Sequence, residues 1–364
     1  MPALPALPNL RRPTMTDVAK AAGVSQSTVS MVLNQMPGAR LAATTRAKVM
    51  RMALELGYRL PRRALVGAGP GEPQRNVIGY IVDEISTSPH PVVSVDGARD
   101  AAWENDCVVT IVVTRSNPEQ EVAAINALVA NPALLGVVYS TIFTRACKVP
   151  DALRDVPTVL LNCHDVHHKL HSVVPGEVAG GHAATEHLIA AGHQRIAFVN
   201  GEAWMEAAQD RFKGYRRALA TADIAFDATL VRNGDWMSGS GFEATLSLMK
   251  LARPPTAIFC ANDLMALGAL EALNQLGKRV PEDISLIGYD DQELARHTHP
   301  PLTTMVLPNY EMGRAAVEAL LALTAGATEQ RSRRQVVKID CPLVERETVQ
   351  RPPRRRAKAA RRPG

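Results

Sequence analysis

Aromatic residues are scarce in this 364-residue sequence, at 4% of the chain, although hydrophobic residues make up 46%. Any core must therefore be built mainly from Ala, Val, Leu and Ile. Cysteine is also sparse, and no Cys-x-x-Cys pair occurs, which argues against a disulfide framework and for reduced thiols in a cytosol. The five cysteines are Cys107, Cys147, Cys163, Cys260 and Cys341.

The sequence contains no run of 18 apolar residues, which argues against a membrane-spanning helix. Prolines interrupt residues 1–13, and no basic start is followed by an apolar block. We therefore expect a disordered arm there rather than a secretory signal. Together with the unpaired thiols, this predicts a cytoplasmic protein with no membrane partner.

Catalytic and metal-binding patterns are also missing. Asp290 and Asp291 are neighbours whose side chains should point in opposite directions, so they do not form an acid–base pair. Four histidines lie within eight residues, but no acidic or cysteine partner is evident, so we expect a solvated loop rather than a metal site. The four are His164, His167, His168 and His171. The expectation is a protein that is not an enzyme and holds no metal or cofactor.

Charge is distributed unevenly along the chain. Residues 1–75 carry 11 Lys/Arg and 3 Asp/Glu, and residues 351–364 carry 7 Lys/Arg and no acid, so residues 76–350 hold a net charge of −10 within a total of +5. A basic head and tail around an acidic body place any contact with a polyanion at the termini. We expect residues 346–364 to form a disordered basic tail that adds nonspecific attraction to phosphate.

Two short helices joined by a glycine turn are predicted near the start of the chain. Thr14 is placed to cap the first helix, with Asp17 in the reciprocal position three residues later. Gly23 can take the left-handed conformation that ends this helix. Ser25 then caps a second helix over residues 26–33.

Apolar spacing gives both helices a buried side. The residues expected to face inward are Val18, Ala19, Ala22, Val29, Val32 and Leu33. The outer face of the second helix then carries Gln26, Ser27, Ser30 and Met31. This arrangement fits a helix-turn-helix whose second helix enters the DNA major groove, although an ordinary helical hairpin has the same pattern.

A third helix is expected to complete a small domain over residues 14–60. Its buried stripe consists of Val49, Met52, Ala53 and Leu56, and Gly57 should end it. The Gly and Pro density of residues 61–75 marks a linker. The GAGPG within it is not a dinucleotide loop, because no strand precedes it and no helix follows.

From residue 76 onward, short apolar runs alternate with helical stretches. The runs cover residues 77–82, 108–113, 136–140, 158–162, 195–200, 256–262 and 285–290. Continuous apolar runs are typical of parallel strands buried on both faces, so we expect two doubly wound α/β subdomains. The helices expected between them cover residues 119–130, 178–191, 210–220, 240–251 and 263–276.

Several apolar runs end in a polar residue. Doubly wound sheets bind ligands at the carboxyl ends of their strands, so the recurrence indicates a ligand crevice. The residues concerned are Asp83, Ser140, Asn162, Asn200, Asn262 and Asp290.

The head resembles the DNA-binding domain of the lactose-repressor (LacI/GalR) family through TMTDVAKAAGVSQSTVSMVLN and TRAKVMRMALELGYR. The resemblance implies that bases are read by Gln26, Ser27 and Met31. It also implies a second set of residues that contact DNA phosphates or position the head on the DNA. They are Thr14, Ser25, Thr28, Ser30 and Asn34. Many members carry a basic or polar residue where Met31 stands. Leu65 is the candidate for the family's minor-groove hinge residue, in a stretch whose glycines are poor helix formers.

The body resembles the family's effector domain, which is similar to a periplasmic sugar-binding protein. The motifs are EHLIAAGHQRIAFVNG, DRFKGYRRAL, PPTAIFCANDLMALGAL, VPEDISLIGYDD and PPLTTM. The resemblance implies effector contacts from Asn162, Arg211, Trp236, Asn262 and Asp290, with Asp83, Ser140 and Trp204 as further candidates. Leu307 stands where Gln is common, and Gly176 and Glu177 replace the usual Asp-Asn.

The resemblance implies a bacterial transcription regulator, a repressor, that binds operator DNA as a homodimer and responds to a small molecule, most simply a sugar. The effector domain should span residues 76–345, with one subdomain over 76–174 and 306–333 and the other over 175–305 and 334–345. Two alternatives remain: a carbohydrate-binding protein without a DNA role, and an α/β enzyme with an appended DNA-binding head.

Overall fold

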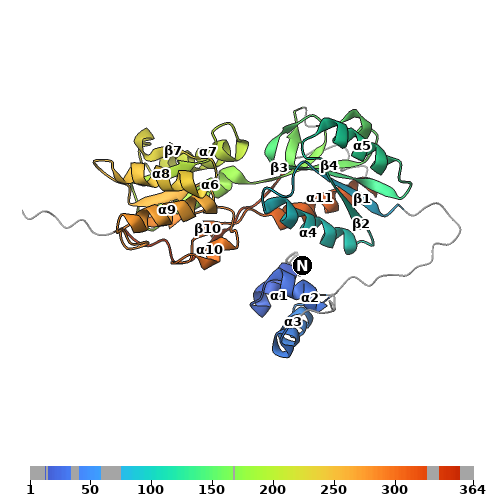
Figure 1. Cartoon of the computed structure of the whole chain (residues 1–364), viewed down its shortest axis with the longest axis horizontal. Coiled ribbons are helices and arrows are strands. Elements are labelled where there is room, and N and C mark those ends of the chain that lie inside the picture. Colours follow the sequence, from blue (N-terminus) through green and yellow to red (C-terminus); the bar gives the residue numbers. More distant parts are fainter. Residues whose placement is uncertain are drawn as a thin grey trace, which may run out of the picture. The chain divides into compact units, whose positions relative to one another are not determined.

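The computed structural model describes residues 13, 15–33, 41–58, 75–166, 169–325 and 336–352 of the chain. These residues form a small helical head and a body of two α/β lobes (Figure 1). Some predictions lie outside the described residues. They concern the arm 1–12, residues 61–74 of the expected linker, and the roles of Thr14, Asn34 and Leu65.

The head consists of three helices around one apolar cluster. They are α1 (Met15–Ala22), α2 (Gln26–Leu33) and α3 (Ala43–Glu55). All six residues expected to face inward from the first two helices belong to this cluster, together with Val49 and Ala53 of α3. Gly23 and Gly57 have φ values of +63° and +70°, which confirms that each follows a helix in the left-handed region.

The expected burial of Leu56 was wrong. Helix α3 ends at Glu55, and Leu56 occupies the C-cap position with 40% of its surface exposed. Because the helix ends before Leu56, the helical spacing does not bring this side chain to the core. Tyr58 packs against the cluster instead.

The first lobe contains a parallel sheet of six strands in the order β11-β5-β4-β3-β1-β2. The strands are β1 (Val77–Val82), β2 (Val108–Val113), β3 (Leu134–Cys147), β4 (Thr158–Asp165), β5 (His171–Pro175) and β11 (Val336–Ile339). One face packs against α4 (His90–Trp103) and α11 (Asn309–Thr324), and the other against α5 (Pro118–Val129). The short helix η1 (Asp151–Leu153) closes the α5 side.

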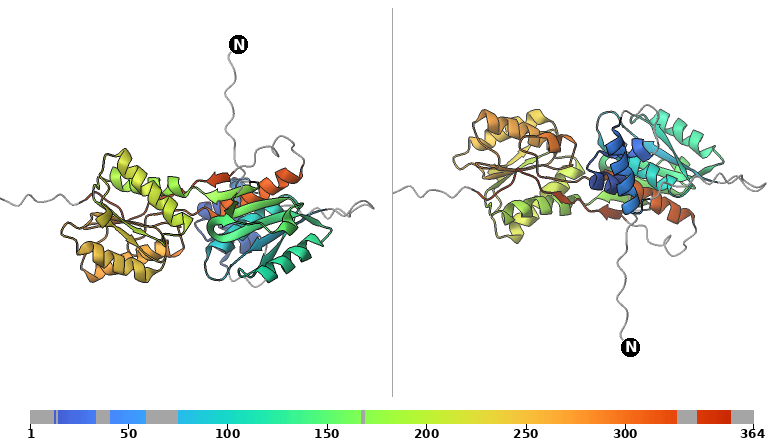
Figure 2. Two further views of the ribbon diagram at one scale, coloured as in Figure 1. Left: turned by 90° about the horizontal axis from the view of Figure 1, so that it is seen from above. Right: turned by 90° about the horizontal axis from the view of Figure 1, so that it is seen from below.

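The second lobe contains a parallel sheet of four strands in the order β7-β6-β8-β9. The strands are β6 (Ile196–Asn200), β7 (Val231–Asn233), β8 (Ala257–Cys260) and β9 (Ser285–Ile287). The helices are α6 (Glu177–Ala190), α7 (Glu206–Thr221), α8 (Ser238–Met249) and α9 (Asp263–Gln275), with the short η2 (Ala228–Leu230) and α10 (Leu294–His297). Figure 2 shows helices on both faces of this sheet.

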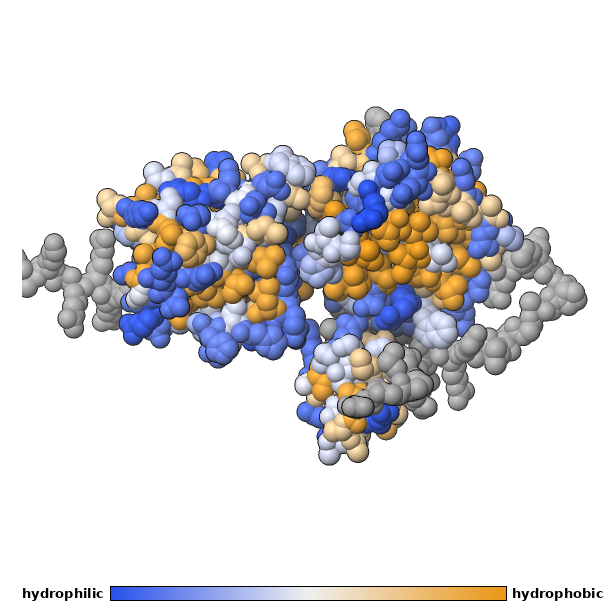
Figure 3. Space-filling model, in the orientation of Figure 1, coloured by the Kyte–Doolittle hydropathy of each residue, from blue (hydrophilic) through white to orange (hydrophobic). Residues whose placement is uncertain are grey.

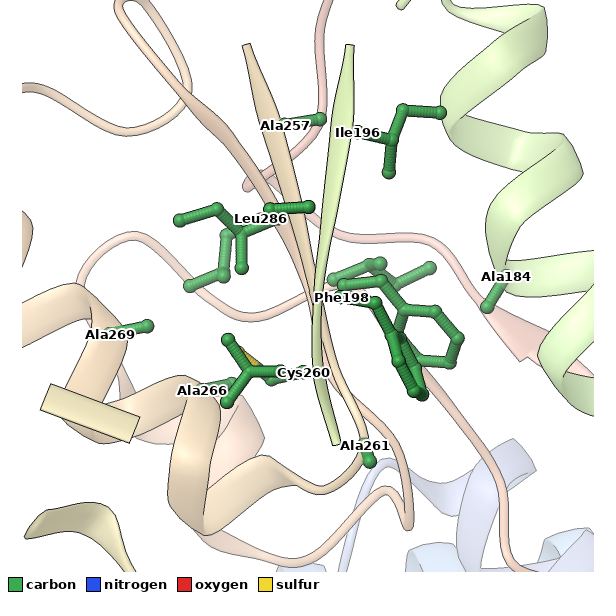
Figure 4. Close-up of a cluster of buried hydrophobic side chains, with 14 of the residues drawn as sticks. Ala184, Ile196, Phe198, Ala257, Cys260, Ala261, Ala266, Ala269 and Leu286 are labelled. Carbon is green, nitrogen blue, oxygen red and sulfur yellow. The ribbon is translucent and has the colours of Figure 1, made fainter. Parts of the chain in front are cut away.

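The core of the second lobe is continuous across its sheet. Figure 4 shows Ala184 of α6 on one side of the strands and Ala266 and Ala269 of α9 on the other. Phe198, from the inner strand β6, is fully buried and packs in this cluster with Tyr215, Phe259 and Tyr289. The sheet is therefore shielded from water on both faces, as its apolar strands predict.

Three chain segments connect the lobes. They follow β5, β10 (Thr304–Met305) and β11, and the last leads into β12 (Leu343–Val344), which pairs antiparallel with β10. The backbone N–H of Gly176 donates to the carbonyl oxygen of Ile339 at 2.8 Å, so two of these segments run side by side.

Three expectations about the body need correction. Residues 336–339 pair with β5, so this part of 334–345 belongs to the first lobe, not the second. Residues 346–352 are packed rather than part of a free tail, because Thr348 is buried and donates to the carbonyl oxygen of Leu286 at 2.7 Å. The strand over 108–113 is not buried on both faces, because it is an edge strand with Val108 and Ile111 exposed.

Within the described residues, no helix combines the length and the apolar character that crossing a membrane requires.

Candidate functional site

The second helix of the head presents polar side chains in its first turn. The Oγ atom of Ser25 accepts the backbone N–H of Thr28 at 3.2 Å, which confirms the predicted cap. The same hydroxyl bonds those of Ser27 and Thr28 at 2.8 and 2.9 Å. Ser27 is exposed, while Gln26 and Met31 are half-buried. Thr28 and Ser30 are half-buried as well, so the structure puts all these side chains at the surface of α2, and their DNA contacts stay predictions.

The body has a second group of candidate residues, where strand ends of both lobes meet. On the first lobe, Asp83 follows β1 and accepts the backbone N–H of Ile142 at 2.8 Å. Its other oxygen accepts from Arg145 at 2.8 Å. Burial raises the pKa of Asp83 above its ordinary value, and the hydrogen bond from Ile142 and the charge of Arg145 counteract part of this rise.

Asn162 lies within β4, not at its end as predicted, and uses its amide to hold the strand beside the register shift of β3. Its Nδ2 donates to the carbonyl oxygen of Thr141 at 3.0 Å, and its Oδ1 accepts from Thr144 at 2.7 Å. Its φ of 57° turns the chain into the left-handed region, which Asn tolerates better than most residues. A small pocket is lined by Ser140 and Asn162 from β3 and β4 and by His90, Ser94, Asn309 and Met312 from the two helices of this face.

The facing wall of the second lobe is ionic. Arg211 of α7 is 3% exposed and donates from Nε and Nη2 to the two oxygens of Glu177 at 2.7 and 2.8 Å. Its Nη1 donates to the carbonyl oxygen of Ala261 and lies 3.4 Å from Oδ1 of Asp290. The guanidinium also lies 3.7 Å from the ring centre of Tyr289.

The pairing of Glu177 with Arg211 depends on a close approach of α6 and α7. A Cβ atom on Gly181 would lie 2.4 Å from the carbonyl oxygen of Arg211, and one on Gly214 would lie 2.4 Å from that of Val178. Only glycine permits backbones this close. The two helices therefore bring residues 34 positions apart in sequence into direct contact.

Opposing effects set the pKa values of the buried acids. Burial would raise the pKa of Asp290, but the nearby His90 and Arg211 lower it below its ordinary value. The pKa of Asp263 is raised well above its ordinary value by burial and by the charge of Asp290. Asp263 accepts from Thr304 at 2.6 Å and from the backbone of Gln292 at 2.8 Å.

Trp236 and Asn262 lie together on the second lobe. Oδ1 of Asn262 caps α9 by accepting the backbone N–H of Met265 at 2.9 Å, and its Nδ2 donates to the carbonyl oxygen of Trp236 at 2.9 Å. The indole N–H of Trp236 donates to the sulfur of Met205 at 2.8 Å, and the ring centre lies 5.6 Å from Arg211. Asn262 thus orients the tryptophan through its backbone.

Three contacts join the lobes around this cleft. His90 lies 3.5 Å from Oδ2 of Asp290, and His164 lies 3.0 Å from both carboxylate oxygens of Glu206. The third is an edge-to-face contact of Phe143 with Trp204, whose ring centres lie 5.5 Å apart and whose tryptophan is 62% exposed. The cleft is therefore bordered by both lobes.

Sequence reasoning missed Glu177, Glu206 and His90. Glu177 was visible only as a departure from the family pattern, and its partner could not be named. His164 belongs to the histidine-rich segment, and an acidic partner does exist for it, from a helix 42 residues away. Across the described part of the chain, no three His, Cys, Asp or Glu side chains are grouped closely enough to hold a metal ion.

Comparison with known families follows this division of the chain. Residues 14–60 match the bacterial regulatory proteins of the lacI family, and residues 185–349 match the periplasmic binding protein-like domain. An HTH-type transcriptional repressor, PurR of Vibrio campbellii, is 32% identical over 340 residues, which cover 93% of this chain and 99% of that protein. The chain belongs to the lacI family of bacterial regulatory proteins. It is a DNA-binding transcriptional repressor of the lacI family.

Solved structures of lacI-family regulators share the whole architecture. A complex of the transcriptional regulator CelR with cellobiose is 31% identical, with a TM-score of 0.63, over 93% of this chain and all of that one. A lac repressor dimer bound to operator and the anti-inducer ONPF has the same identity, score and coverage. The ribose operon repressor of Haemophilus influenzae is 31% identical over 309 residues, which cover 85% of this chain and 91% of that protein. The relatives named here are transcription regulators rather than enzymes.

Proposed function

We propose that this lacI-family protein is a repressor whose affinity for operator DNA is controlled by a small molecule bound between the two lobes of its body. The observation that carries the proposal is the combination, in one chain, of a capped helix with a polar first turn and a two-lobed cleft with converging polar side chains. A DNA-binding head can exist without a ligand-binding body, and the reverse also holds. Their presence in one chain supports DNA binding that is controlled by a ligand.

The DNA-reading part of the proposal assigns Gln26, Ser27 and Met31 to base edges. A Gln side chain can pair with adenine in the major groove, and Met31 offers only an apolar contact, for instance to a thymine methyl group. Ser25 and Thr28 are placed to contact phosphates at the helix start, where backbone N–H groups also face the DNA. We expect the operator to be near-palindromic, because two copies of α2 would read it.

A carbohydrate is the effector that we propose. Sugars need hydrogen bonds to several hydroxyl groups and an aromatic ring against their C–H face, and the cleft offers Asp290 and Asn162 together with Trp236. Two of the relatives are named for sugars: the CelR structure is a complex with cellobiose, and one repressor is that of a ribose operon. A binding step would favour one relative orientation of the lobes and so shift the population of DNA-binding molecules.

We further propose that the protein acts as a homodimer in the bacterial cytoplasm, where its DNA partner is found. Figure 3 shows apolar side chains gathered on one face of the lobe that carries β1 and β2. On the same lobe, the exposed apolar residues include Val92 and Val93 of α4 and Val108 and Ile111 of β2. A contiguous apolar surface of this kind marks an interface, and a dimer of the lac repressor is among the similar structures.

The test begins with selection of bound sequences from a random double-stranded DNA library by the purified protein. The expected result is one near-palindromic motif, whose affinity falls steeply between low and moderate salt because phosphate contacts release counterions. Thermal-shift screening against mono- and disaccharides should then yield a ligand that stabilises the protein and changes its affinity for that motif. Selection of no motif would contradict the DNA-reading role, and a sugar that is turned over would indicate an enzyme.

A further inference from the structure

Glu177 sets the charge of the inner wall of the cleft. Its side chain is 4% exposed, and both of its carboxylate oxygens accept hydrogen bonds from Arg211. Asp290 presents a second carboxylate to the same guanidinium, 3.4 Å from Nη1. Two carboxylates against one guanidinium leave this wall with a net charge of −1 when both acids are ionised.

Arg211 has little capacity left for an anionic ligand. A guanidinium carries five N–H donors, and three of them are used in hydrogen bonds to Glu177 and to the carbonyl oxygen of Ala261. One face of its plane is covered by the ring of Tyr289. A phosphate or carboxylate that approached the remaining donors would meet Glu177 and Asp290 beside them, and like charges at such distances repel.

The rest of the cleft does not offset this charge. Arg145 of the first lobe is already paired with Asp83 at 2.8 Å. His164 lies against Glu206, and His90 lies against Asp290. Each of these Arg and His side chains therefore lies against a carboxylate, and His90 shares that of Asp290 with Arg211.

One acceptor at this wall lacks a donor. Oδ1 of Asp290 is buried and makes no hydrogen bond among the described residues, although the side chain is 4% exposed. A buried polar atom without a hydrogen bond destabilises the folded state, and the guanidinium 3.4 Å away offsets this only through its charge. A ligand that donates an O–H or N–H group to this oxygen removes that cost, whereas a ligand that only accepts does not.

We propose that Glu177 is a specificity-determining residue that makes this cleft select uncharged or cationic effectors, which donate a hydrogen bond to Asp290, and reject ligands bearing phosphate or carboxylate groups. Glu177 acts through Arg211, by occupying the donors that an anion would need. The proposal rests on the proposed function, because it concerns the ligand of the same cleft.

Inorganic phosphate is a direct probe of this role and requires no knowledge of the effector. The melting temperature is measured with phosphate and with chloride at equal ionic strength, for the wild type and for Glu177→Gln. The wild type should show no specific stabilisation by phosphate. Glu177→Gln should gain a saturable, phosphate-dependent rise, because Arg211 regains donors and the wall loses one negative charge.

The matched control is Glu206→Gln, which removes a cleft carboxylate that does not contact Arg211 in the structure. It should gain no stabilisation by phosphate. Stabilisation of the wild type, a gain in Glu206→Gln equal to that in Glu177→Gln, or no gain in Glu177→Gln would each overturn the role of Glu177. If Glu177→Gln does not fold, Glu177→Asn, with the residue usual in the family at this position, takes its place.

A second arm compares ribose and glucose with ribose 5-phosphate, glucose 6-phosphate, glucuronate and glucosamine by calorimetry. Any ligand of the wild type should be a neutral sugar or the amino sugar, and Glu177→Gln should shift the affinity ratio at least tenfold toward the phosphorylated partner. Tighter binding of a phosphate or an acid to the wild type would overturn the inference. Binding of none of the six would count against a sugar of this size as effector, while the phosphate probe still decides the role of Glu177.

Discussion

The two walls of the cleft are held together by different forces. On the first lobe, the residues at the cleft are fixed largely by hydrogen bonds between side chains and backbone, and the ion pair of Asp83 with Arg145 involves an arginine that is 39% exposed. On the second lobe, Arg211 is 3% exposed and is surrounded by Glu177, Asp290 and the ring of Tyr289. Arginine is thus partly solvated on one wall and enclosed in a low-dielectric interior on the other.

The difference determines what each wall can contribute. An exposed ion pair contributes little to stability, because solvent screens the attraction and the side chains lose entropy. A buried cluster is held in one geometry, because removing one partner leaves an uncompensated charge. We therefore expect the second wall to resist rearrangement and to set charge selectivity, and the first wall to adapt to ligands of different shape.

The largest expected effect distinguishes the two arginines. Arg211→Met leaves Glu177 and Asp290 buried without their cation, and should lower the free energy of unfolding by about 3–5 kcal/mol. Arg145→Met removes the matched cation of the first wall and should cost less, about 1–3 kcal/mol, because Asp83 is buried but keeps its hydrogen bond from the backbone of Ile142. Urea denaturation with an analysis of midpoint and slope measures both.

Equal losses for these two variants would abolish the distinction between the walls. A further control is Arg211→Lys, which keeps the charge but cannot reproduce the two-pronged contact with Glu177. It should fall between the wild type and Arg211→Met. A full recovery by lysine would show that charge alone, without the planar geometry of the guanidinium, holds the second wall.

The next effect concerns ligand binding. Trp236→Ala should abolish the thermal stabilisation by the sugar identified in the screen, a loss of about 2 kcal/mol or more of binding free energy for a central aromatic contact. Operator binding should stay intact, because the head is a separate unit. Trp204→Ala should weaken the sugar response far less, since this ring is mostly exposed and contacts Phe143. A full sugar response in Trp236→Ala would exclude the proposed stacking role.

The comparison of the walls also shows how far sequence reasoning reaches. Motifs placed Arg211, Asn262 and Asp290 on the second lobe, and the structure brings all three to one cleft. The pairing of Arg211 with Glu177 could not be predicted, because it depends on the tertiary contact of α6 with α7. The sequence shows the glycines that permit this contact. It does not show which residues the contact brings together.

Two further features could not be predicted from the sequence: which strand lies at the edge of a sheet, and where the chain crosses between the lobes. The run Val108–Val113 has the composition of a buried strand, yet β2 lies at the edge of its sheet, because apolar spacing does not encode the number of neighbours. Likewise β11 joins the first sheet only because the chain crosses between the lobes a third time. In the head, by contrast, the short range of the cap at Ser25 and of the turn at Gly23 made both predictable from the sequence.

The smallest expected effect contrasts the two ends of the strands in the second sheet. At the end opposite the cleft, His193 is 1% exposed. Its Nε2 donates to the carbonyl oxygen of Gln350 at 2.8 Å, and its Nδ1 lies 2.9 Å from Thr256 Oγ1. Burial lowers the pKa of His193 below its ordinary value, and the hydrogen bond to Gln350 only partly opposes this. The buried His193 therefore favours its neutral form, whereas the buried side chains at the cleft are ionic; the ion pair of Arg195 with Asp227 near His193 is more exposed.

The sign of the resulting pH dependence follows from this depressed pKa. The unfolded chain binds a proton at His193 more readily than the folded one, so the contribution is complete above the unfolded pKa, about 6.5, and is lost as the pH falls toward the folded value. The slope in that window is at most about 1.4 kcal/mol per pH unit for one group. The pKa of Asp290 is lowered, so its contribution is lost only in stronger acid, as the pH falls below about 4. Urea denaturation at pH 7.5 and 5.5 should therefore show a loss in the wild type that is reduced in His193→Gln. An equal loss in both proteins would show that His193 is not the source of the acid sensitivity in this window.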